Sequence, residues 1–326
     1  MQEVAAPGGA SAEPALVGRL APSPTGLLHL GHVRTFLVAY WHARSRGGRL
    51  LLRIEDLDGP RAHRRFADAA LRDLEWLGID WDGAPSVQSE HLERFERAVE
   101  TLLERGLAYA CVCTRGDLAN AAAAPHAGAT EPRYPGTCRG RFTSRAEAEA
   151  TTGRTAGVRL VVPPGAVVVH DELAGARSFD VAAEVGDFLV ARRGGGAAYQ
   201  LAVVVDDAAE GVTEVVRGDD LLPSAARQWH VQRALGLPHP RWAHVPLVLS
   251  ATGERLAKRT DALSLEALRE RGVDPRVIVR WAAQSAGVRT AERATAAEIT
   301  SIFRLDRVPR APVTLTAAAV DEFTPR

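Results

Sequence analysis

The hydrophobic positions in the first third of the chain alternate between strand-like runs and helical spacing. An apolar run at residues 15–20 is followed, after a loop of small residues, by helically spaced apolar positions at 33–40. A second apolar run at 49–54 is typical of a buried parallel strand, and amphipathic stretches follow at about 61–77 and 90–105. Strand, helix, strand and helix in this order predict an α/β fold built on a doubly wound parallel sheet.

The middle of the chain changes to shorter strand-like runs. Val-rich segments separated by Pro-Gly at 157–180 predict a small β-rich insert, with V-R-L-V-V-P and A-V-V-V-H-D as its strands. Residues 187–205, with a glycine run inside them, predict a hairpin that returns to the main sheet. The remaining predicted elements are a strand that ends at Arg217, a helix at about 224–235, a strand at 244–249 and about three helices in 263–326.

The loop between the first strand and the first helix has the features of a phosphate site. Residues 19–32 read R-L-A-P-S-P-T-G-L-L-H-L-G-H, in which two prolines stiffen the loop and Gly26 and Gly31 let backbone approach a ligand. Free N–H groups and the helix dipole at the start of the helix favour an anion there, beside His29 and His32. Two alternatives for these histidines are a pair on a helix surface and a metal pair, although no further ligand follows at useful spacing.

Composition narrows the class of protein. With 326 residues, 46% of them hydrophobic and 25% charged, the chain has an ordinary globular composition and room for two or three packed units. No apolar run approaches the roughly 18 residues of a membrane span, and residues 1–14 lack the features of a signal peptide, so we expect a cytoplasmic protein with a flexible N-terminal tail. The net charge is zero, which gives no support for nonspecific nucleic-acid binding. Two arginine clusters could form a basic face or be solvated helix faces: Arg61, Arg64, Arg65 and Arg139, Arg141, Arg145.

Among 40 basic residues only one, Lys258, is a lysine. A bias that has converted nearly every basic position to arginine has therefore spared this one. Lysine is a compact point charge whereas arginine is a planar fork, so Lys258 is a candidate for chemistry that arginine cannot perform.

Charged side chains also stand at the ends of two predicted strands. Glu55 follows the strand at 49–54, and Arg217 ends a later one, so both should reach the edge of the sheet where α/β proteins bind ligands. Arg19 and Arg217 suit a ligand carboxylate, which arginine binds in bidentate fashion, and Glu55 suits an ammonium group. The alternative is that Arg19 and Glu55 only pair with each other.

All three cysteines lie in one short region. Cys111 and Cys113 form C-V-C, and Cys138 ends Y-P-G-T-C. Three thiolates supply most of the ligands of a tetrahedral structural zinc, whereas three buried structural cysteines are the alternative and a disulfide is not expected in the cytoplasm. From chemistry alone His126 would be the fourth ligand, because imidazole binds zinc more readily than a phenol.

These motifs together resemble the glutamyl-type class I aminoacyl-tRNA synthetases. H-L-G-H takes the place of their HIGH motif, and Y-Q-L-A-V-V-V-D-D and G-V-T-E-V-V-R-G-D-D-L are also similar. E-R-L-A-K-R-T resembles their KMSKS motif at L-x-K and departs from it at Arg255, Ala257 and Arg259, which removes one hydroxyl donor. The resemblance implies a Rossmann-like catalytic domain that binds ATP, accompanied by Mg²⁺, through His29, Gly31, His32 and Lys258, with His29, His32 and Lys258 catalytic.

The same resemblance implies a glutamate site and a zinc site. The positions that match the family's glutamate-binding residues are Arg19, Ser23, Glu55, Tyr199 and Arg217. The pattern C-x-C, Y-x-x-x-C favours Tyr134 over His126 as the fourth zinc ligand, so the expected set is Cys111, Cys113, Tyr134 and Cys138.

A fuller resemblance, over about residues 19–259, is to the glutamyl-queuosine tRNA(Asp) synthetases. It implies activation of L-glutamate by ATP without tRNA, and transfer of glutamate to queuosine in the anticodon loop of tRNA(Asp), by a protein that we expect to be a monomer. The alternatives are a truncated glutamyl-tRNA synthetase that charges tRNA(Glu), a catalytically silent paralogue that binds tRNA or a protein, and a small adenylyltransferase of the H-x-G-H type.

The expected organisation follows from this resemblance. After the tail, 15–110 and 187–262 form the two halves of the catalytic domain, the second half with the KMSKS-like loop. Residues 111–186 form a zinc-containing insert of the acceptor-binding type. Residues 263–326 form a short helical region, with no room for an anticodon-binding domain.

Overall fold

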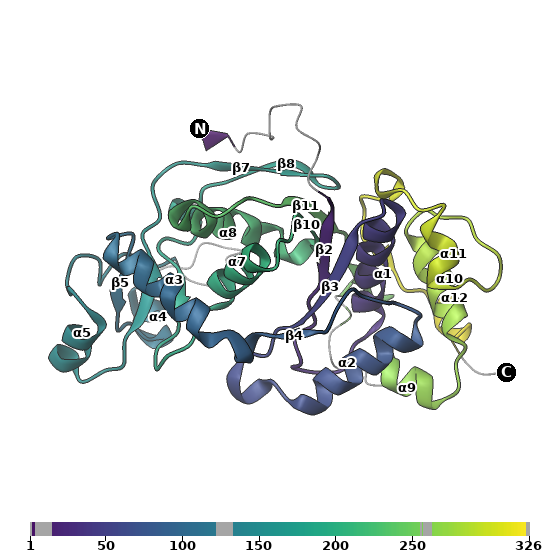
Figure 1. Cartoon of the computed structure of the whole chain (residues 1–326), viewed down its shortest axis with the longest axis horizontal. Coiled ribbons are helices and arrows are strands. Elements are labelled where there is room, and N and C mark those ends of the chain that lie inside the picture. The colour runs from purple at the N-terminus through teal and green to yellow at the C-terminus, as the bar shows by residue number, and fades with distance from the viewer. Residues whose placement is uncertain (1, 4–14, 122–132, 255, 257–262, 324–326) are drawn as a thin grey trace.

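A computed structural model describes residues 2–3, 15–121, 133–254, 256 and 263–323. Its centre is a parallel sheet with helices on both faces (Figure 1). A small antiparallel sheet lies at one end of the molecule, on the left in Figure 1, and the C-terminal helices lie at the other end. The α/β class and the parallel sheet predicted from the sequence are confirmed.

The parallel sheet is assembled from two groups of strands that are distant in sequence. In the first group β2 (Val17–Leu20), β3 (Arg49–Ile54) and β4 (Ser86–Val87) pair in this order. In the second group β10 (Glu214–Gly218) pairs with β11 (Arg241–Val245), β11 with β7 (Val167–Asp171), and β7 with β1 (Gln2–Glu3), while β8 (Gly175–Phe179) runs antiparallel to β7.

The two groups meet where β2 lies beside β10. The Thr213 N–H donates to the carbonyl of Val17 at 2.9 Å, and the Val17 N–H donates to the Thr213 hydroxyl at 2.9 Å. The carboxyl ends of β2, β3 and β10 therefore come together, and that edge is where parallel sheets place ligands.

Side chains that alternate along the sheet strands pack into two separate hydrophobic cores, one on each face of the sheet. In β10 Val215 packs with one core and its neighbour Val216 with the other, as expected when successive side chains point to opposite faces. The core on the Val216 side is built around α1 (Leu30–Ser45) and the core on the Val215 side around α3 (Leu92–Glu104) and α8 (Leu222–Leu235). The short elements between the early strands are η1 (Gly59–Arg61), α2 (Arg64–Trp76) and η2 (Gln88–His91).

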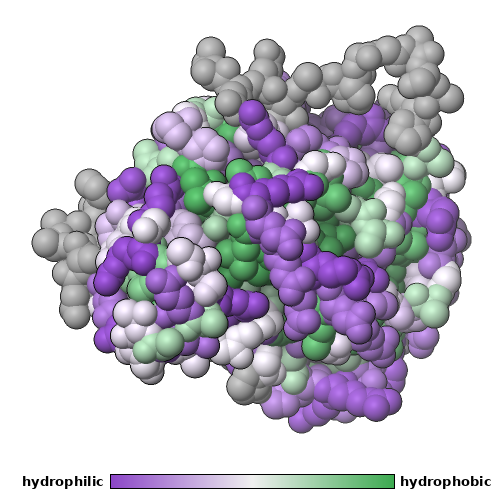
Figure 2. Space-filling model, turned by 60° about the vertical axis from the view of Figure 1, so that its left-hand side comes forward, coloured by the Kyte–Doolittle hydropathy of each residue, from purple (hydrophilic) through white to green (hydrophobic). Residues whose placement is uncertain are grey.

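The Val-rich segments that were predicted to form one insert belong to different sheets. β6 (Gly157–Leu160) pairs antiparallel with β5 (Ala108–Cys111) and with β9 (Leu189–Ala191), whereas β7 joins the central parallel sheet. Helices α4 (Arg115–Ala121), α5 (Arg145–Thr152) and α6 (Val181–Glu184) lie among these strands. Figure 2 turns this end of the molecule toward the viewer and shows mainly hydrophilic side chains with strips of hydrophobic residues between them.

The predicted hairpin at 187–205 is wrong in its second half. β9 is followed by a turn and then by α7 (Tyr199–Ala209), a helix. Its run of three valines suggests a strand, but Leu201, Ala202 and Val203 are all buried, so neither strand nor helix periodicity appears in the sequence. Burial between α3 and α8 outweighs the modest helix propensity of valine.

The last part of the chain contains short strands and four helices among the described residues. The strand predicted at 244–249 is divided, because β11 ends at Val245 and β12 (Val248–Leu249) pairs instead with β13 (Val313–Thr314). The other elements are η3 (Asp219–Leu221), α9 (Leu265–Glu270), α10 (Pro275–Ser285), α11 (Ala296–Thr300), η5 (Leu305–Arg307) and α12 (Ala317–Asp321). Among the described residues, none of the helices has the length and apolar character to cross a membrane.

Candidate active site

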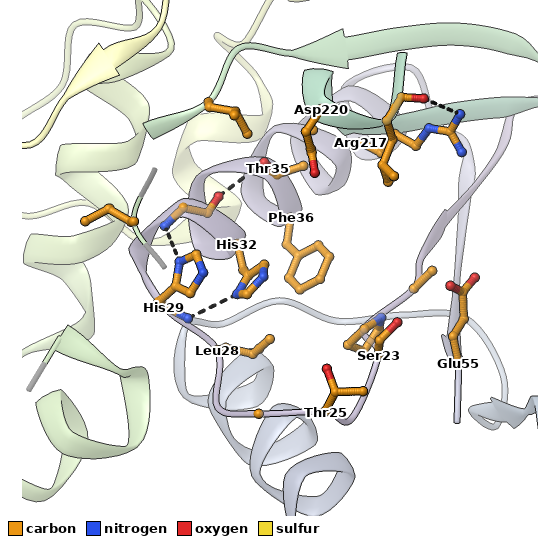
Figure 3. Close-up of a pocket in the computed structure, with 18 of the residues that line it drawn as sticks. Ser23, Thr25, Leu28, His29, His32, Thr35, Phe36, Glu55, Arg217 and Asp220 are labelled. Atoms are coloured by element: carbon orange, nitrogen blue, oxygen red, sulfur yellow. Dashed lines mark hydrogen bonds between the residues drawn. The ribbon is translucent and has the colours of Figure 1, made fainter. Parts of the chain in front are cut away.

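A cavity of about 330 Å³ opens at the edge of the sheet where β2, β3 and β10 end. Its wall includes the loop after β2, the start of α1, Glu55 directly after β3, and Arg217 of β10 (Figure 3). Tyr199 of α7 also lines it. The predicted site residues that line it are Arg19, Ser23, His29, Gly31, His32, Glu55, Tyr199 and Arg217. The fold therefore brings together residues that the sequence separates by almost 200 positions.

Two histidines shape the start of α1. His29 is the N-cap, and its Nδ1 accepts a hydrogen bond from the Gly31 N–H at 3.2 Å, while the Nδ1 of His32 accepts from the His29 N–H at 3.3 Å (Figure 3). A ring that accepts at Nδ1 carries its proton on Nε2 when neutral, so each ring is a donor at Nε2. A Cβ at Gly31 would lie 3.1 Å from Cε1 of His29, so glycine lets this ring pack against the helix backbone.

Glu55 belongs to a buried network of charges centred on Arg53. The guanidinium of Arg53 lies 3.1 Å from a Glu55 oxygen, 2.7 Å from Asp207 and 2.7 Å from Glu210. The Nε of Arg19 lies 3.4 Å from the same Asp207 carboxylate. Arg19 and Glu55 are thus connected through Asp207 and Arg53, and both remain in the wall of the cavity.

The buried arginines of this network shift the pKa values of Glu55 and Asp207. Burial raises the pKa of Glu55, and the attraction of Arg53 and Arg19 opposes that rise. Burial acts in the same direction on Asp207, but Arg53 and Arg19 outweigh it and hold the pKa of Asp207 below its usual range. Asp207 is therefore the permanent anion that keeps the two arginines in place.

Arg217 reaches the cavity from the end of β10. It is 5% exposed, and its guanidinium lies 4.7 Å above the centre of the Trp242 ring. Its Nε–H donates to Nε2 of His244 at 3.0 Å and its Nη2 donates to the Leu221 carbonyl at 3.2 Å. Burial, with the nearby positive charge of Arg19, lowers the pKa of Arg217.

Two further predicted residues offer hydroxyl groups. Ser23 lies in the loop after β2, and Tyr199 is the first residue of α7, where its side chain is 39% exposed. Lys258, together with the departures from the lysine motif at 255, 257 and 259, lies outside the described residues. Leu256, which the structure does describe, lines the cavity.

The structure adds residues to the site for which the sequence predicts no role. Arg53, Asp207 and His244 hold the predicted side chains. Asp207 ends the motif Y-Q-L-A-V-V-V-D-D without a role assigned to it, and Arg53 and His244 belong to none of the quoted motifs. The sequence contains one indication for Arg53: it lies two residues before Glu55, and side chains two apart in a strand share a face.

The three cysteines form a cluster at the end of β5. Their sulfur atoms all lie within 4.8 Å of one another, with 3.5 Å between Cys113 and Cys138. The hydroxyl of Tyr134 lies 3.4 Å from the sulfur of Cys111 and 4.0 Å from that of Cys113. His126, the alternative ligand, lies outside the described residues.

The chemistry of this cluster fits a thiophilic metal. Zinc–sulfur bonds of about 2.3 Å in a tetrahedron place sulfur atoms about 3.8 Å apart, close to the spacing found here. Burial and the neighbouring sulfur of Cys111 raise the pKa of Cys113 to about 12, whereas hydrogen bonds outweigh burial and lower the pKa of Cys138. Three thiolates at this spacing would repel one another, and a divalent cation would remove that repulsion.

A family model agrees with this architecture. The model described as tRNA synthetases class I (E and Q), catalytic domain, matches residues 15–319. The chain belongs to this family. The resemblance predicted from the sequence motifs is therefore confirmed, and the cavity at the HIGH-like motif lies in the catalytic domain of the family.

Two curated relatives with the same name are similar to this chain over most of its length. A "Glutamyl-Q tRNA(Asp) synthetase" of Symbiobacterium thermophilum is 44% identical over 315 residues, which cover 94% of this chain and 97% of that protein. One of the same name from Nocardia farcinica is 45% identical over 304 residues, covering 92% and 93%. Among solved structures, the glutamate-tRNA synthetase of Elizabethkingia anophelis superposes with a TM-score of 0.82 at 26% identity, covering 95% of this chain and 70% of that one.

Proposed function

We propose that this protein activates L-glutamate with ATP, without tRNA, and transfers the glutamyl group to queuosine in the anticodon loop of tRNA(Asp). The observation that carries the proposal is the match, over 97% of its length, to a relative named Glutamyl-Q tRNA(Asp) synthetase. The geometry of the cavity supports it, because donors for a phosphate and two arginines for a carboxylate face one space. With a tRNA as substrate, the protein would act in the cytoplasm.

In the activation step a carboxylate oxygen of glutamate attacks the α-phosphorus of ATP, and the bond to pyrophosphate breaks. No covalent intermediate with the protein is needed, so the protein acts by positioning and by stabilising charge. The Nε2 donors of His29 and His32 would hold the nucleotide beside Gly31, where the dipole of α1 favours its phosphates. Lys258 would neutralise charge on the phosphates, and Mg²⁺ would accompany ATP as it does in most phosphoryl chemistry.

The charges of the cavity suit glutamate. Its side-chain carboxylate would bind Arg19 and Arg217, and its α-ammonium group would bind Glu55. Ser23 and Tyr199 would add hydroxyl groups to the same site. A neutral amino acid would leave two buried arginines without a carboxylate, which is costly in a desolvated site.

The cysteine cluster would hold one structural zinc ion. Cys111, Cys113 and Cys138 would be thiolate ligands, and Tyr134 the fourth. Arg159 packs against this arrangement, because it donates to the sulfur of Cys111 at 3.2 Å and lies 3.8 Å above the centre of the Tyr134 ring.

The test is transfer of labelled glutamate by purified protein with ATP. We expect label on tRNA(Asp) that contains queuosine, and none on the same tRNA without queuosine or on tRNA(Glu). Label on tRNA(Glu) would instead establish a charging enzyme like the glutamate-tRNA synthetases. Absence of label on all three and no glutamate-dependent exchange of pyrophosphate into ATP, with binding of tRNA or a protein retained, would favour the catalytically silent alternative.

A further inference from the structure

The guanidinium of Arg217 is held on three sides and has one nitrogen left over. Its Nε and Nη2 donate to His244 and to the Leu221 carbonyl, and one face lies on the Trp242 ring. Its Nη1 is buried and has no hydrogen-bond partner among the described residues. Because Arg217 lines the cavity, Nη1 is the donor that remains for a ligand carboxylate.

The contact with His244 requires one tautomer of that histidine. Arginine has only donors, so Nε2 of His244 must be the acceptor and cannot carry a proton. Burial, with the charge of Arg217, lowers the pKa of His244, which is 1% exposed, and the ring is therefore neutral near pH 7. Its single proton is on Nδ1, which lies 2.6 Å from Oδ2 of Asp171.

Asp171 is itself held in one orientation. Its Oδ1 accepts from the backbone N–H groups of Leu173 at 2.9 Å, Ala174 at 2.7 Å and His244 at 3.2 Å. Oδ2 is then directed to the imidazole of His244. The three strands β7, β11 and β10 thus carry an ordered chain of hydrogen bonds from Asp171 through His244 to Arg217.

We propose that Asp171 and His244 are positioning residues, which hold Arg217 in the orientation that binds the side-chain carboxylate of glutamate and so favour glutamate over glutamine. This proposal rests on the proposed function. Asp171 fixes the tautomer of His244, the acceptor on His244 fixes Nε of Arg217, and Nη1 is left to bind the carboxylate. A glutamine amide in that place would put its own donor or a weaker, uncharged acceptor against Nη1.

The first variant is Asp171→Asn. Its amide oxygen must stay where three N–H groups converge, so the new NH₂ faces Nδ1 of His244. Nδ1 then has to accept, the proton moves to Nε2, and Nε2 meets the Nε–H of Arg217 as donor against donor. We expect the KM for glutamate in pyrophosphate exchange to rise about tenfold, the loss of one hydrogen bond to a charged group, while the KM for ATP stays the same.

Two substitutions at His244 distinguish the contribution of Nε2 from that of Nδ1. Glutamine reaches the place of Nε2 and keeps an acceptor for Arg217, whereas asparagine reaches only the place of Nδ1. We expect His244→Gln to keep a glutamate KM near that of the wild type and His244→Asn to raise it about tenfold. These two variants test whether the acceptor at Nε2 positions Arg217, even if Asp171→Asn folds poorly.

The matched control is Glu214→Gln. Glu214 forms a second buried carboxylate–histidine pair, 2.5 Å from Nε2 of His42, but neither residue lines the cavity. We expect this variant to lose stability and keep its glutamate KM and its preference for glutamate over glutamine.

A tautomer change of His244 in Asp171→Asn should appear in the ¹⁵N NMR shifts of the ring.

The outcomes separate the two proposals. A wild-type protein without glutamate-dependent exchange would remove the proposed function. An active wild type whose Asp171→Asn and His244→Asn variants keep the wild-type KM and discrimination would overturn the positioning role alone. Equal increases in KM for glutamate and ATP, or the same change in Glu214→Gln, would also overturn it, because a general loss of structure would explain them.

Discussion

At the scale of single residues, one of the many arginines, Arg53, has a specific structural role in the site. Arg53 is 1% exposed and donates hydrogen bonds to three carboxylates at once, in a geometry that suits a planar fork with five N–H donors and not an ammonium group. The motif residues of the cavity could be predicted from the sequence because they stand in a recognisable order. Asp171 and His244 could not, because only the pairing of strands brings positions 171, 244 and 217 together.

A substitution that keeps the charge of Arg53 tests this view. We expect Arg53→Lys to lower the free energy of unfolding by about 1–3 kcal/mol, because at least one buried carboxylate loses its partner. Urea denaturation measures the loss. Arg97→Lys is the control, since its ion pair with Glu93 is exposed and should contribute less than about 0.5 kcal/mol. Equal effects of the two substitutions would contradict the role of the fork.

At the scale of elements, the contact between α2 and α9 contains a buried acid. Both side-chain oxygens of Asp73 are buried without a hydrogen bond among the described residues, and the nearest cation, Arg269, is 3.5 Å away. Burial raises the pKa of Asp73 to about 7. The folded protein therefore keeps this carboxyl protonated at pH values where the unfolded chain has released the proton.

The sign of the pH dependence follows. Between about pH 4 and pH 7 the unfolded chain binds fewer protons at this position than the folded protein, so Asp73 makes the free energy of unfolding fall as the pH rises. We expect Asp73→Asn to be more stable than the wild type at pH 8, by up to a few kcal/mol, and to match it near pH 4. Urea midpoints across this range provide the measurement. Glu75→Gln, an exposed change in the same helix, should show no such crossover.

The sequence predicts helices that have one solvent-exposed face better than elements that are buried on all sides. Helices with one solvent face, such as α2 and α3, were predicted to within a few residues, because polar positions mark their outer side. The buried helix α7 was taken for a strand, since it has no polar side to mark. The sequence does not indicate the division between β11 and β12, because both segments are apolar. The carbonyl of Pro246 between them accepts from Arg34 at 2.6 Å in place of a sheet partner.

At the scale of the whole molecule, the cysteine cluster has a small core of its own. Tyr109, Ala110, Cys111, Tyr134 and Cys138 pack together, separate from the two cores of the central sheet. Removing the proposed metal should therefore loosen only one end of the molecule.

Hydrogen exchange would test this independence. A strong chelator, or Cys138→Ser, should release about one zinc per chain and increase amide exchange at 108–112 and 156–160, with little change at 49–54. Zinc content comes from elemental analysis of the same samples. Retention of zinc in Cys138→Ser, or faster exchange throughout the chain, would contradict a local structural site.

The adjacency of β2 and β10 has a consequence for the growing chain on the ribosome. The hydrogen bond that joins them spans 196 residues. At about 5–20 residues per second, β2 waits on the order of 10–40 seconds for its neighbour to be synthesised. Until then the edge of β2 is unpaired on that side, so slower translation of this chain would prolong the period in which nascent copies can associate through that edge.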